Sequence, residues 1–287
     1  MGVTLVFGWP NWVRRNLLHE NLLMGKIKTK GGSMNKKILF FATVLLFFIG
    51  VSGEFKNDLT QADSPFVEII ALGDSITHGT GDHTKKGYIG WFKESYQAGT
   101  DHRLLLKNYG VPKYRTTNVL EQLDQSHVQR YILKADYLIL YIGTNDFRKS
   151  MNYDFENINH ERANDGKDQY SKNLDKILSE IRNTQSEIPI FILGLYHPYT
   201  NFNNHQQLGS LIDEWNTTIQ QVVNSYDHIH YIPTIDLLNS EPKEKLFSDD
   251  LHPNSKGHQL IANRLLEAIL NAEKESNKRL EISSDNE

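Results

Sequence analysis

Residues 66–75 read FVEIIALGDS, a run of mostly apolar residues that ends in a glycine, an aspartate and a serine. Apolar runs of this length, rich in isoleucine and valine and bounded by a turn signal, are typical of strands buried on both faces of a sheet. The glycine favours a tight turn directly after the strand. This stretch therefore predicts a buried strand over 66–72, with Ser75 presented just beyond its carboxyl end.

The same alternation of apolar runs and helical patterns continues along the chain. Further strands are predicted over 103–108, 137–142, 188–195 and 228–235. Helices are predicted over 91–98, 118–123, 128–134, 170–182, 211–223 and 255–272. Strands that alternate with helices favour a parallel sheet covered by helices on both faces. The sequence therefore predicts one α/β domain over 66–273, built on a five-stranded parallel sheet.

Residues that can take part in catalysis or binding follow four of the predicted strands. Open parallel sheets form their binding sites beyond the carboxyl ends of the strands. Ser75 follows the first strand, Gly110 the second and Asn145 the third, while Asp249 and His252 lie in a loop after the fifth. We therefore expect these five residues to meet at one edge of the sheet.

Ser75, His252 and Asp249 are the residue types that acyl transfer from an ester requires. A serine hydroxyl is a weak nucleophile until a base removes its proton, and histidine is a suitable base near neutral pH. An aspartate three residues before the histidine can orient its imidazole ring. Asp250 is the alternative orienting carboxylate, and a plain helix N-cap is the alternative role of Ser75.

An ester carbonyl also needs hydrogen-bond donors for the negative charge that develops on its oxygen. The backbone N–H groups of Ser75 and Gly110 and the side chain of Asn145 are the candidate donors of this oxyanion hole. Gly110 has the alternative of serving the backbone conformation only, and Asn145 that of bracing a turn. No cluster of residues has the spacing of metal ligands, so the sequence predicts neither a metal nor a cofactor.

Four blocks of the sequence resemble the SGNH/GDSL hydrolase family. They are Gly73-Asp74-Ser75-Ile76, Gly110, Gly143-Thr144-Asn145-Asp146 and Asp249-Asp250-Leu251-His252-Pro253, in the order of the family. The resemblance covers about residues 66–270 and points in particular to the secreted lipase/acylhydrolase type of Gram-positive bacteria. It implies a flavodoxin-like three-layer α/β/α sandwich that hydrolyses acyl esters without a metal.

Two positions depart from that pattern. Residues 112–113 are Pro-Lys, where relatives often have a second glycine, so the shape of the loop after Gly110 is left open. Ile76 replaces the usual leucine, which is a conservative change. Thr77 stands where the nucleophile elbow of an α/β-hydrolase would have its second glycine, and this argues against that other fold.

Two further segments are candidates for contact with substrate. Tyr196, His197 and Tyr199 follow the predicted fourth strand and are candidates for lining an acyl or leaving-group subsite. Residues 147–169 form a long polar stretch that is either a lid or a solvated loop.

The composition excludes some classes of protein. The chain has 287 residues, a formal net charge of −4 and no cysteine. Without a basic excess it cannot neutralise many phosphates, which argues against a nucleic-acid partner. Without cysteine it has no disulfide and no thiolate metal site.

The N-terminal part carries an export pattern. Lys36 and Lys37 precede an apolar run over 38–51 that ends in small residues, which is typical of a secretory signal. We therefore expect a secreted or cell-envelope protein of a bacterium, whose contact with the membrane is limited to an uncleaved signal. Around the domain we predict a translated leader over 1–33, a signal peptide or anchor over 34–53, a linker over 54–65 and a disordered polar tail over 274–287.

Together these features predict a serine ester hydrolase. Its substrate would be an acyl-ester small molecule or lipid, cleaved through an acyl-serine intermediate. Two alternatives remain at this point. One is a domain of the same fold that binds envelope glycans without turnover, and the other is an acyltransferase that uses the same residues.

Overall fold

The computed structural model describes the backbone of residues 66–284 and the side chains of residues 66–276. The predicted leader, signal and linker over residues 1–65 lie outside the described residues. Within the described part of the chain, no helix combines the length and the apolar composition that a membrane span requires.

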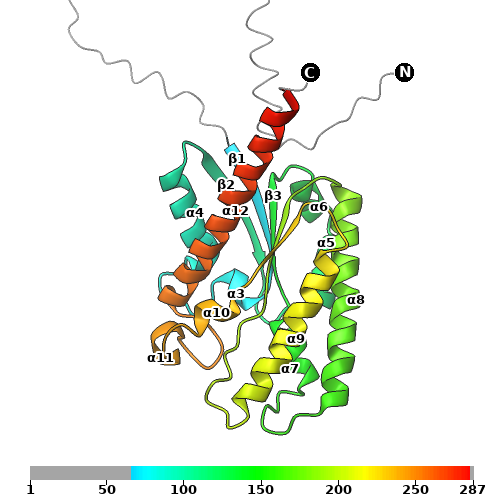
Figure 1. Ribbon diagram of the computed structural model, residues 1–287, viewed down its shortest axis with the longest axis vertical. Coiled ribbons are helices and arrows are strands. Elements are labelled where there is room, and N and C mark those ends of the chain that lie inside the picture. Colours follow the sequence, from blue (N-terminus) through cyan, green and yellow to red (C-terminus); the bar gives the residue numbers. More distant parts are fainter. Residues whose placement is uncertain (1–65, 285–287) are drawn as a thin grey trace, which may run out of the picture.

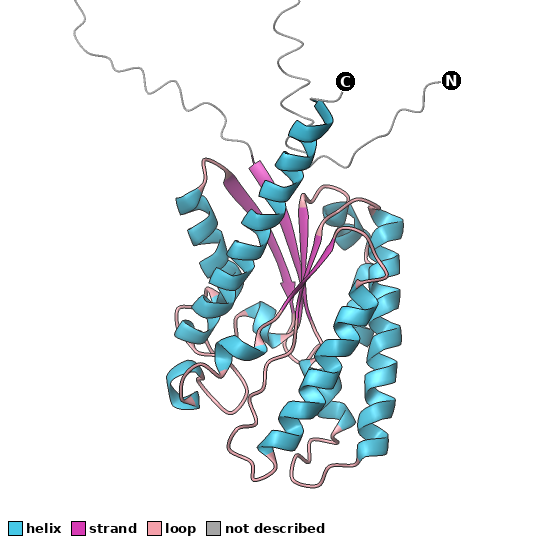
Figure 2. Cartoon of the chain, in the orientation of Figure 1, coloured by secondary structure: helices cyan, strands magenta, loops and turns pink. Residues whose placement is uncertain are grey.

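The centre of the domain is an all-parallel sheet in the order β2-β1-β3-β4-β5 (Figure 1). Its strands are β1 (Phe66–Gly73), β2 (Arg103–Gly110), β3 (Tyr137–Tyr141), β4 (Ile190–Leu193) and β5 (Ile229–Ile232). This confirms the predicted five-stranded parallel sheet, although β4 and β5 are shorter than their apolar runs. Figure 2 shows the strands side by side between two layers of helices.

Alternate residues of β1 pack into two separate hydrophobic cores, one on each face of the sheet. Val67, Ile69 and Ala71 face the core made with α4 (Gly87–Gly99) and α12 (Ser255–Ser284). Ile70 and Leu72 face the other core. That second core is covered by α5 (Thr116–Leu123), α6 (Ser126–Ile132), α8 (His160–Thr184) and α9 (His205–Val223). Because β1 is buried on both faces, it reads as a nearly continuous apolar run.

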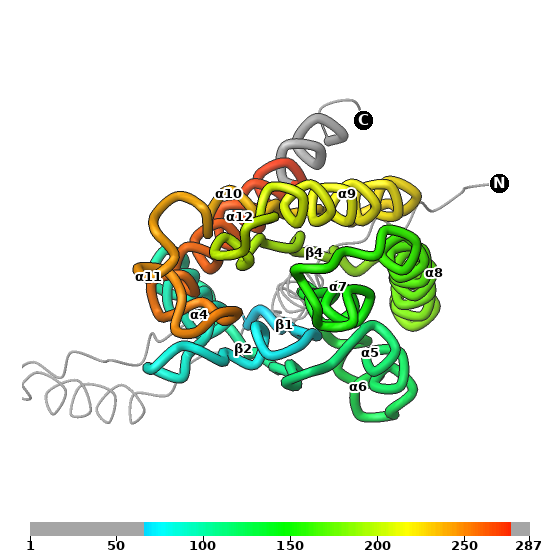
Figure 3. Tube along the Cα trace, turned by 90° about the horizontal axis from the view of Figure 1, so that it is seen from below, coloured from blue at the N-terminus to red at the C-terminus, as the bar shows by residue number. Residues whose placement is uncertain are grey.

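Four short helices lie at the carboxyl edge of the sheet, which Figure 3 shows from below. They are α3 (Ser75–His78), α7 (Thr144–Ser150), α10 (Ile235–Leu238) and α11 (Lys243–Leu246). The sequence suggested only a helix beginning near Ser75, through the N-cap alternative, and the other three were not predicted, because so few residues show little of the 3.6-residue repeat. Two of the four, α3 and α7, carry Ser75 and Asn145.

Two segments differ from the expectation. Residues 147–169 are mostly helical, comprising the end of α7, a connection over 151–159 and the start of α8. Met151 and Phe155 in that connection are buried, and the Phe155 ring stacks on Tyr199 with centroids 4.2 Å apart. The polar residues at the start of α8 concealed its helical repeat.

The predicted polar tail also differs, since α12 continues to Ser284. Neither proline nor glycine occurs between residues 258 and 284, so nothing interrupts the helix. Glu273 helps to hold it, because its carboxylate accepts hydrogen bonds from the hydroxyls of Tyr96 (3.0 Å) and Tyr137 (2.9 Å).

Candidate active site

Ser75 is presented by a tight turn at the end of β1. A Cβ atom on Gly73 would lie 2.4 Å from the carbonyl oxygen of Tyr141, so only glycine fits there. Asp74 then caps α3, because its Oδ1 accepts a hydrogen bond from the N–H of Ile76 (2.9 Å). Ser75 is the first residue of that helix, and its exposed fraction is only 6%.

His252 is held by a closed loop between β5 and α12. A β-bridge joins Phe247 to Pro253, and the N–H of Ser248 donates to the carbonyl oxygen of His252 (2.9 Å). Inside the loop, Oδ1 of Asp249 accepts hydrogen bonds from the N–H groups of Leu251 (2.8 Å) and His252 (2.7 Å). These bonds fix the carboxylate and the imidazole relative to each other.

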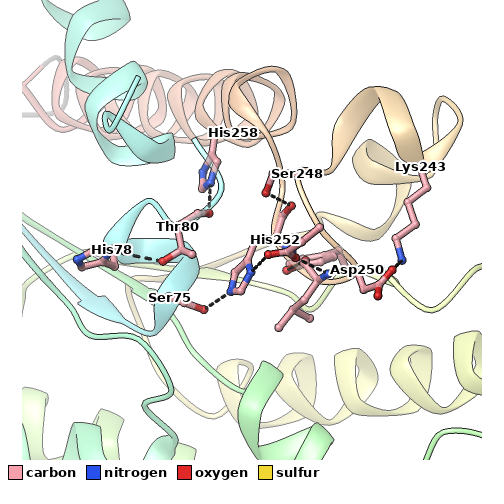
Figure 4. A network of polar contacts seen from close by, with 11 residues as sticks. Ser75, His78, Thr80, Lys243, Ser248, Asp250, His252 and His258 are labelled. Atoms are coloured by element: carbon pink, nitrogen blue, oxygen red, sulfur yellow. Dashed lines mark hydrogen bonds and ion pairs between the residues drawn. The ribbon is translucent and has the colours of Figure 1, made fainter. Parts of the chain in front are cut away.

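Three predicted residues form a chain of hydrogen bonds at this edge of the sheet. Oδ2 of Asp249 lies 2.7 Å from Nδ1 of His252, and Nε2 of His252 lies 3.1 Å from Oγ of Ser75 (Figure 4). With the ring proton on Nδ1, the Nε2 atom is left as an acceptor for the Ser75 hydroxyl. The arrangement can therefore withdraw a proton from the serine.

Asp249 and not Asp250 approaches the imidazole ring. The side chain of Asp250 is fully exposed, and its nearest ionic partner is Lys243 Nζ at 3.7 Å. Burial raises the pKa of Asp249, but hydrogen bonds from the backbone and side chain of His252 and the backbone of Leu251 outweigh it. The pKa of Asp249 therefore lies below its usual value, and the carboxylate is ionised near neutral pH.

Asn145 reaches the same place from α7. It is 7% exposed, and its Nδ2 donates to the carbonyl oxygen of Tyr114 (3.0 Å) and, at 3.5 Å, to Oδ2 of Asp74. The second contact is at the limit of a hydrogen bond, so that hydrogen is only weakly engaged. The role of Asn145 as an oxyanion donor stays a prediction.

Gly110 has a clear packing role. A Cβ atom at this position would lie 2.4 Å from the backbone nitrogen of His78 in α3, so a side chain has no room. Its N–H donates to Oδ1 of Asn108 (2.9 Å), whose amide donates in turn to the carbonyl oxygen of Thr77 (2.7 Å). Because this N–H is already engaged, its role as an oxyanion donor requires that bond to open and stays a prediction.

The three residues predicted to line a subsite make different contacts. The Tyr196 hydroxyl donates to the carbonyl oxygen of Leu251 (2.7 Å) and so supports the loop of His252. Tyr199 is buried in an aromatic cluster that includes Phe155. His197 lines a cavity of about 210 Å³.

A buried network that the sequence did not reveal ties the segment after α3 to α12. Asp82 accepts hydrogen bonds from Trp91 Nε1 (3.0 Å) and Ser255 Oγ (2.5 Å). His258 Nδ1 accepts from the N–H of Tyr88 (3.0 Å), and its Nε2 donates to the carbonyl oxygen of Thr80 (3.0 Å). The only signal was the position of His258 shortly after His252.

This network borders directly on the loop that carries His252. Gly81 lies between Thr80 and Asp82, and a Cβ atom there would approach the Cβ of His252 to 2.9 Å. The close approach, together with a positive φ of 96°, explains the glycine. The segment and the loop therefore support each other.

Asp74 is the most strongly perturbed carboxyl group beside Ser75. Burial raises its pKa to about 7, although the hydrogen bond from the Ile76 N–H opposes the shift. The neighbouring charge of Asp146 adds to the increase. Among the described residues, no group of three or more histidine, aspartate or glutamate side chains is placed to hold a metal ion.

Comparison with known proteins identifies relatives that cover most of this chain. The model of the GDSL-like lipase/acylhydrolase family matches residues 71–260. Protein YpmR of Bacillus subtilis is 31% identical over 207 residues, which is 71% of this chain and 81% of YpmR. The spore germination lipase LipC of Bacillus licheniformis is 25% identical over 208 residues, or 69% of this chain and 94% of LipC.

Solved structures share the fold at lower identity. The lipase Lip_vut3 from a goat rumen metagenome has a TM-score of 0.61 at 21% identity, covering 70% of this chain and 97% of Lip_vut3. A catalytic mutant of Axe2, an acetylxylan esterase from Geobacillus stearothermophilus, has a TM-score of 0.56 at 17% identity. That match covers 71% of this chain and 94% of Axe2.

Proposed function

Because this chain belongs to the GDSL-like lipase/acylhydrolase family, we propose that it is a carboxylic-ester hydrolase with Ser75 as its nucleophile. The observation that carries the proposal is the hydrogen-bonded chain from Ser75 Oγ through His252 to Asp249. The relatives include a lipase and the structural neighbours an acetylxylan esterase, so both lipid and sugar esters belong to the proposed substrate class.

The first half of the reaction forms an acyl-serine. Ser75 Oγ attacks the ester carbonyl carbon while Nε2 of His252 takes the hydroxyl proton. The ionised Asp249 stabilises the imidazolium that results. The ester C–O bond then breaks, and His252 gives its proton to the oxygen of the leaving alcohol.

The second half releases the acid. A water molecule gives a proton to Nε2 of His252 and attacks the acyl carbon, and the proton returns to Ser75 Oγ as the acyl bond breaks. In both halves the carbonyl oxygen becomes negative, and the Ser75 N–H and the Asn145 amide are its proposed donors. Gly110 would join them if its N–H left Asn108.

The test is hydrolysis of p-nitrophenyl esters of increasing chain length by the full chain. We expect release of p-nitrophenol by the wild type and its loss in Ser75→Ala. A wild type that hydrolyses none of these esters, or a Ser75→Ala variant as active as the wild type, contradicts the proposal. Products formed with an added alcohol separate hydrolysis from acyl transfer, since a transferase would yield mainly the new ester.

We also propose that the enzyme acts outside the cytoplasm, supported by Lys36, Lys37 and the apolar run over 38–51. Fractionation of a bacterial host that expresses the full chain tests this. We expect the protein in the medium or the envelope fraction. Recovery in the cytoplasm alone contradicts it.

A further inference from the structure

Residues 79–82 connect Ser75 directly with the loop that carries His252. On one side, the N–H of Thr80 donates to the carbonyl oxygen of Ser75 (2.9 Å). On the other side, a Cβ atom on Gly81 would lie 2.9 Å from the Cβ of His252, so the Gly81 backbone packs against that side chain. The segment therefore lies between the proposed nucleophile and the proposed base, and its position helps to set the distance between them.

The carboxylate of Asp82 fixes the end of this segment. It is 5% exposed, and it accepts hydrogen bonds from the N–H groups of Thr84 (2.9 Å) and Gly87 (2.9 Å), the Thr84 hydroxyl (2.8 Å) and Trp91 Nε1 (3.0 Å). Burial alone would raise the pKa of Asp82, but the hydrogen bond from Ser255, together with the others, holds that pKa well below its usual value. The group is therefore a buried anion that depends on its donors.

Two of these contacts tie the segment to α12, the helix that follows the loop of His252. Ser255 Oγ donates to Oδ1 of Asp82 (2.5 Å), and Nε2 of His258 donates to the carbonyl oxygen of Thr80 (3.0 Å; Figure 4). Thr80 and Asp82 are the two neighbours of the glycine that packs on the loop. The segment and the loop are therefore both fixed to the first turn of one helix, and neither can shift alone.

A buried charge of this kind contributes geometry more than stability. The cost of removing a carboxylate from water offsets much of what its hydrogen bonds contribute to folding. It is satisfied in only one arrangement of its donors, and it therefore makes that arrangement rigid. The reaction needs such precision, because a misplacement of about 1 Å can lower a rate about 100-fold. The 3.1 Å contact between Ser75 Oγ and His252 Nε2 would be lost if the loop moved outward.

We propose that Asp82 is a positioning residue for ester hydrolysis, one that keeps the His252 imidazole within proton-transfer distance of Ser75. This inference rests on the proposed ester hydrolase activity and adds a residue on which that activity depends. Asp82 acts through the backbone of Gly81. Its loss should therefore slow the chemical steps without weakening the binding of substrate.

The experiment measures kcat and KM of full-chain variants with p-nitrophenyl acetate, with kcat expressed per active site titrated by a p-nitrophenyl phosphonate. Asp82→Asn should lower kcat by about tenfold or more and leave KM within about twofold of the wild type, since only the chemical steps are affected. Ser255→Ala removes one donor at a half-buried position and should lower kcat by about threefold or more. Ser255→Thr retains the hydroxyl and should recover most of that loss.

Two controls assign the effect to Asp82. Glu273→Gln makes the same change of charge in a carboxylate that also anchors α12, through Tyr137 at the opposite edge of the sheet from Ser75. Whatever its effect on unfolding in urea, its kcat should equal that of the wild type. His83→Ala removes the exposed ring whose Nδ1 lies 2.6 Å from Ser255 Oγ, and its kcat should also be unchanged.

A double variant separates positioning from a general loss of structure. If Asp82 acts through His252, Asp82→Asn should not lower the residual activity of His252→Ala any further, because residues that act as one unit are not additive. A general loss of structure would lower that residual activity by the same factor as it lowers the activity of the wild type.

The possible failures are distinguishable. The positioning role is overturned by an unchanged kcat in Asp82→Asn, by an equal loss in Glu273→Gln or His83→Ala, or by the same factor with and without His252, and each of these leaves the ester hydrolase standing. Should Asp82→Asn fail to fold, equal kcat values for Ser255→Ala and Ser255→Thr overturn the role as well. A wild type that hydrolyses no p-nitrophenyl ester overturns the proposed function itself.

Discussion

Nε2 of His252 lies 3.1 Å from Oγ of Ser75, although 177 positions separate the two residues in the sequence. The parallel sheet makes this contact possible, because β1 and β5 both end at the same edge. The serine is held by a one-turn helix and the histidine by a closed loop, and the segment after that helix packs against the loop at Gly81.

Ser75→Ala and His252→Ala should each lower kcat by about three orders of magnitude or more. The two residues act as one unit, since proton transfer requires both. The double variant should therefore be little slower than either single variant in a p-nitrophenyl ester assay. Losses that multiply in the double variant would show that the two side chains act independently.

Asp249→Asn should lower kcat by about 10³- to 10⁴-fold, because an amide cannot hold the imidazole in the required tautomer. Asp250→Asn is the matched control on the neighbouring residue. Its exposed ion pair with Lys243 contributes little, so activity should stay within about threefold of the wild type. The assignment is wrong if Asp250→Asn is the more damaging change.

Gly110→Ala should destabilise the protein by about 1–3 kcal/mol, as overpacking of a filled site does. The added methyl would collide with the backbone of Thr77 and His78 in α3, the helix that begins with Ser75. Urea unfolding measures the loss. Gly99→Ala is the control, because nothing lies within 4 Å of a Cβ there. If Gly110→Ala and Gly99→Ala are equally stable, Gly110 does not have the packing role assigned to it.

Stability should decrease as pH rises toward neutrality because of Asp74. Burial raises its pKa to about 7, above the usual 3.8, so the folded state holds a proton that the unfolded state releases. This contribution is complete below about pH 4 and is lost as pH rises through about 7. Each pKa unit corresponds to about 1.4 kcal/mol, which makes the whole effect a few kcal/mol at most.

Asp74→Asn tests this directly, because the amide does not titrate. Between pH 4 and pH 8, the free energy of unfolding of the variant should rise relative to that of the wild type. Asp146 also has a raised pKa and remains in both proteins, so only the difference between them reports on Asp74. If the difference in unfolding free energy between the two proteins does not change with pH, Asp74 is not the group that binds the proton in the folded state.

The sequence predicted the parts of the molecule that local patterns specify. The strands β1, β3 and β4 were predicted because each is an apolar run buried on both faces, whereas the edge strands β2 and β5 have fewer buried residues and were recognised by their apolar residues alone. Ser75 and Asn145 were identified because each follows a predicted strand closely. Asp249 was preferred as the orienting carboxylate, but the sequence left Asp250 as the alternative, because the two residues are identical and adjacent. Only the loop geometry turns Asp249 toward His252 and leaves Asp250 with Lys243.

The remaining features depend on contacts between distant parts of the chain. The hydrogen bond between Asp82 and Ser255 joins residues 173 positions apart, and no periodicity marks either one. The cavity likewise combines His197 after β4 with Lys243 and Phe247 far along the chain. The engagement of the Gly110 N–H by Asn108 depends on the side-chain conformation of the asparagine, which no sequence pattern specifies.

His258 should make the protein less stable as pH falls below about 6.5. Its Nδ1 accepts a hydrogen bond from the Tyr88 N–H and its Nε2 donates to Thr80, so the folded state needs a neutral ring. Burial lowers the pKa of His258, while the Thr80 carbonyl and the charge of Asp82 oppose the shift. The stabilisation is therefore present above the unfolded pKa of about 6.5 and is lost as pH falls through the lower folded value.

The test is urea unfolding of His258→Gln and of its parent, both carrying Asp74→Asn, so that Asp74 does not contribute to the pH dependence of stability. The parent should lose more stability than His258→Gln between pH 7 and pH 5, and parallel curves would refute the assignment.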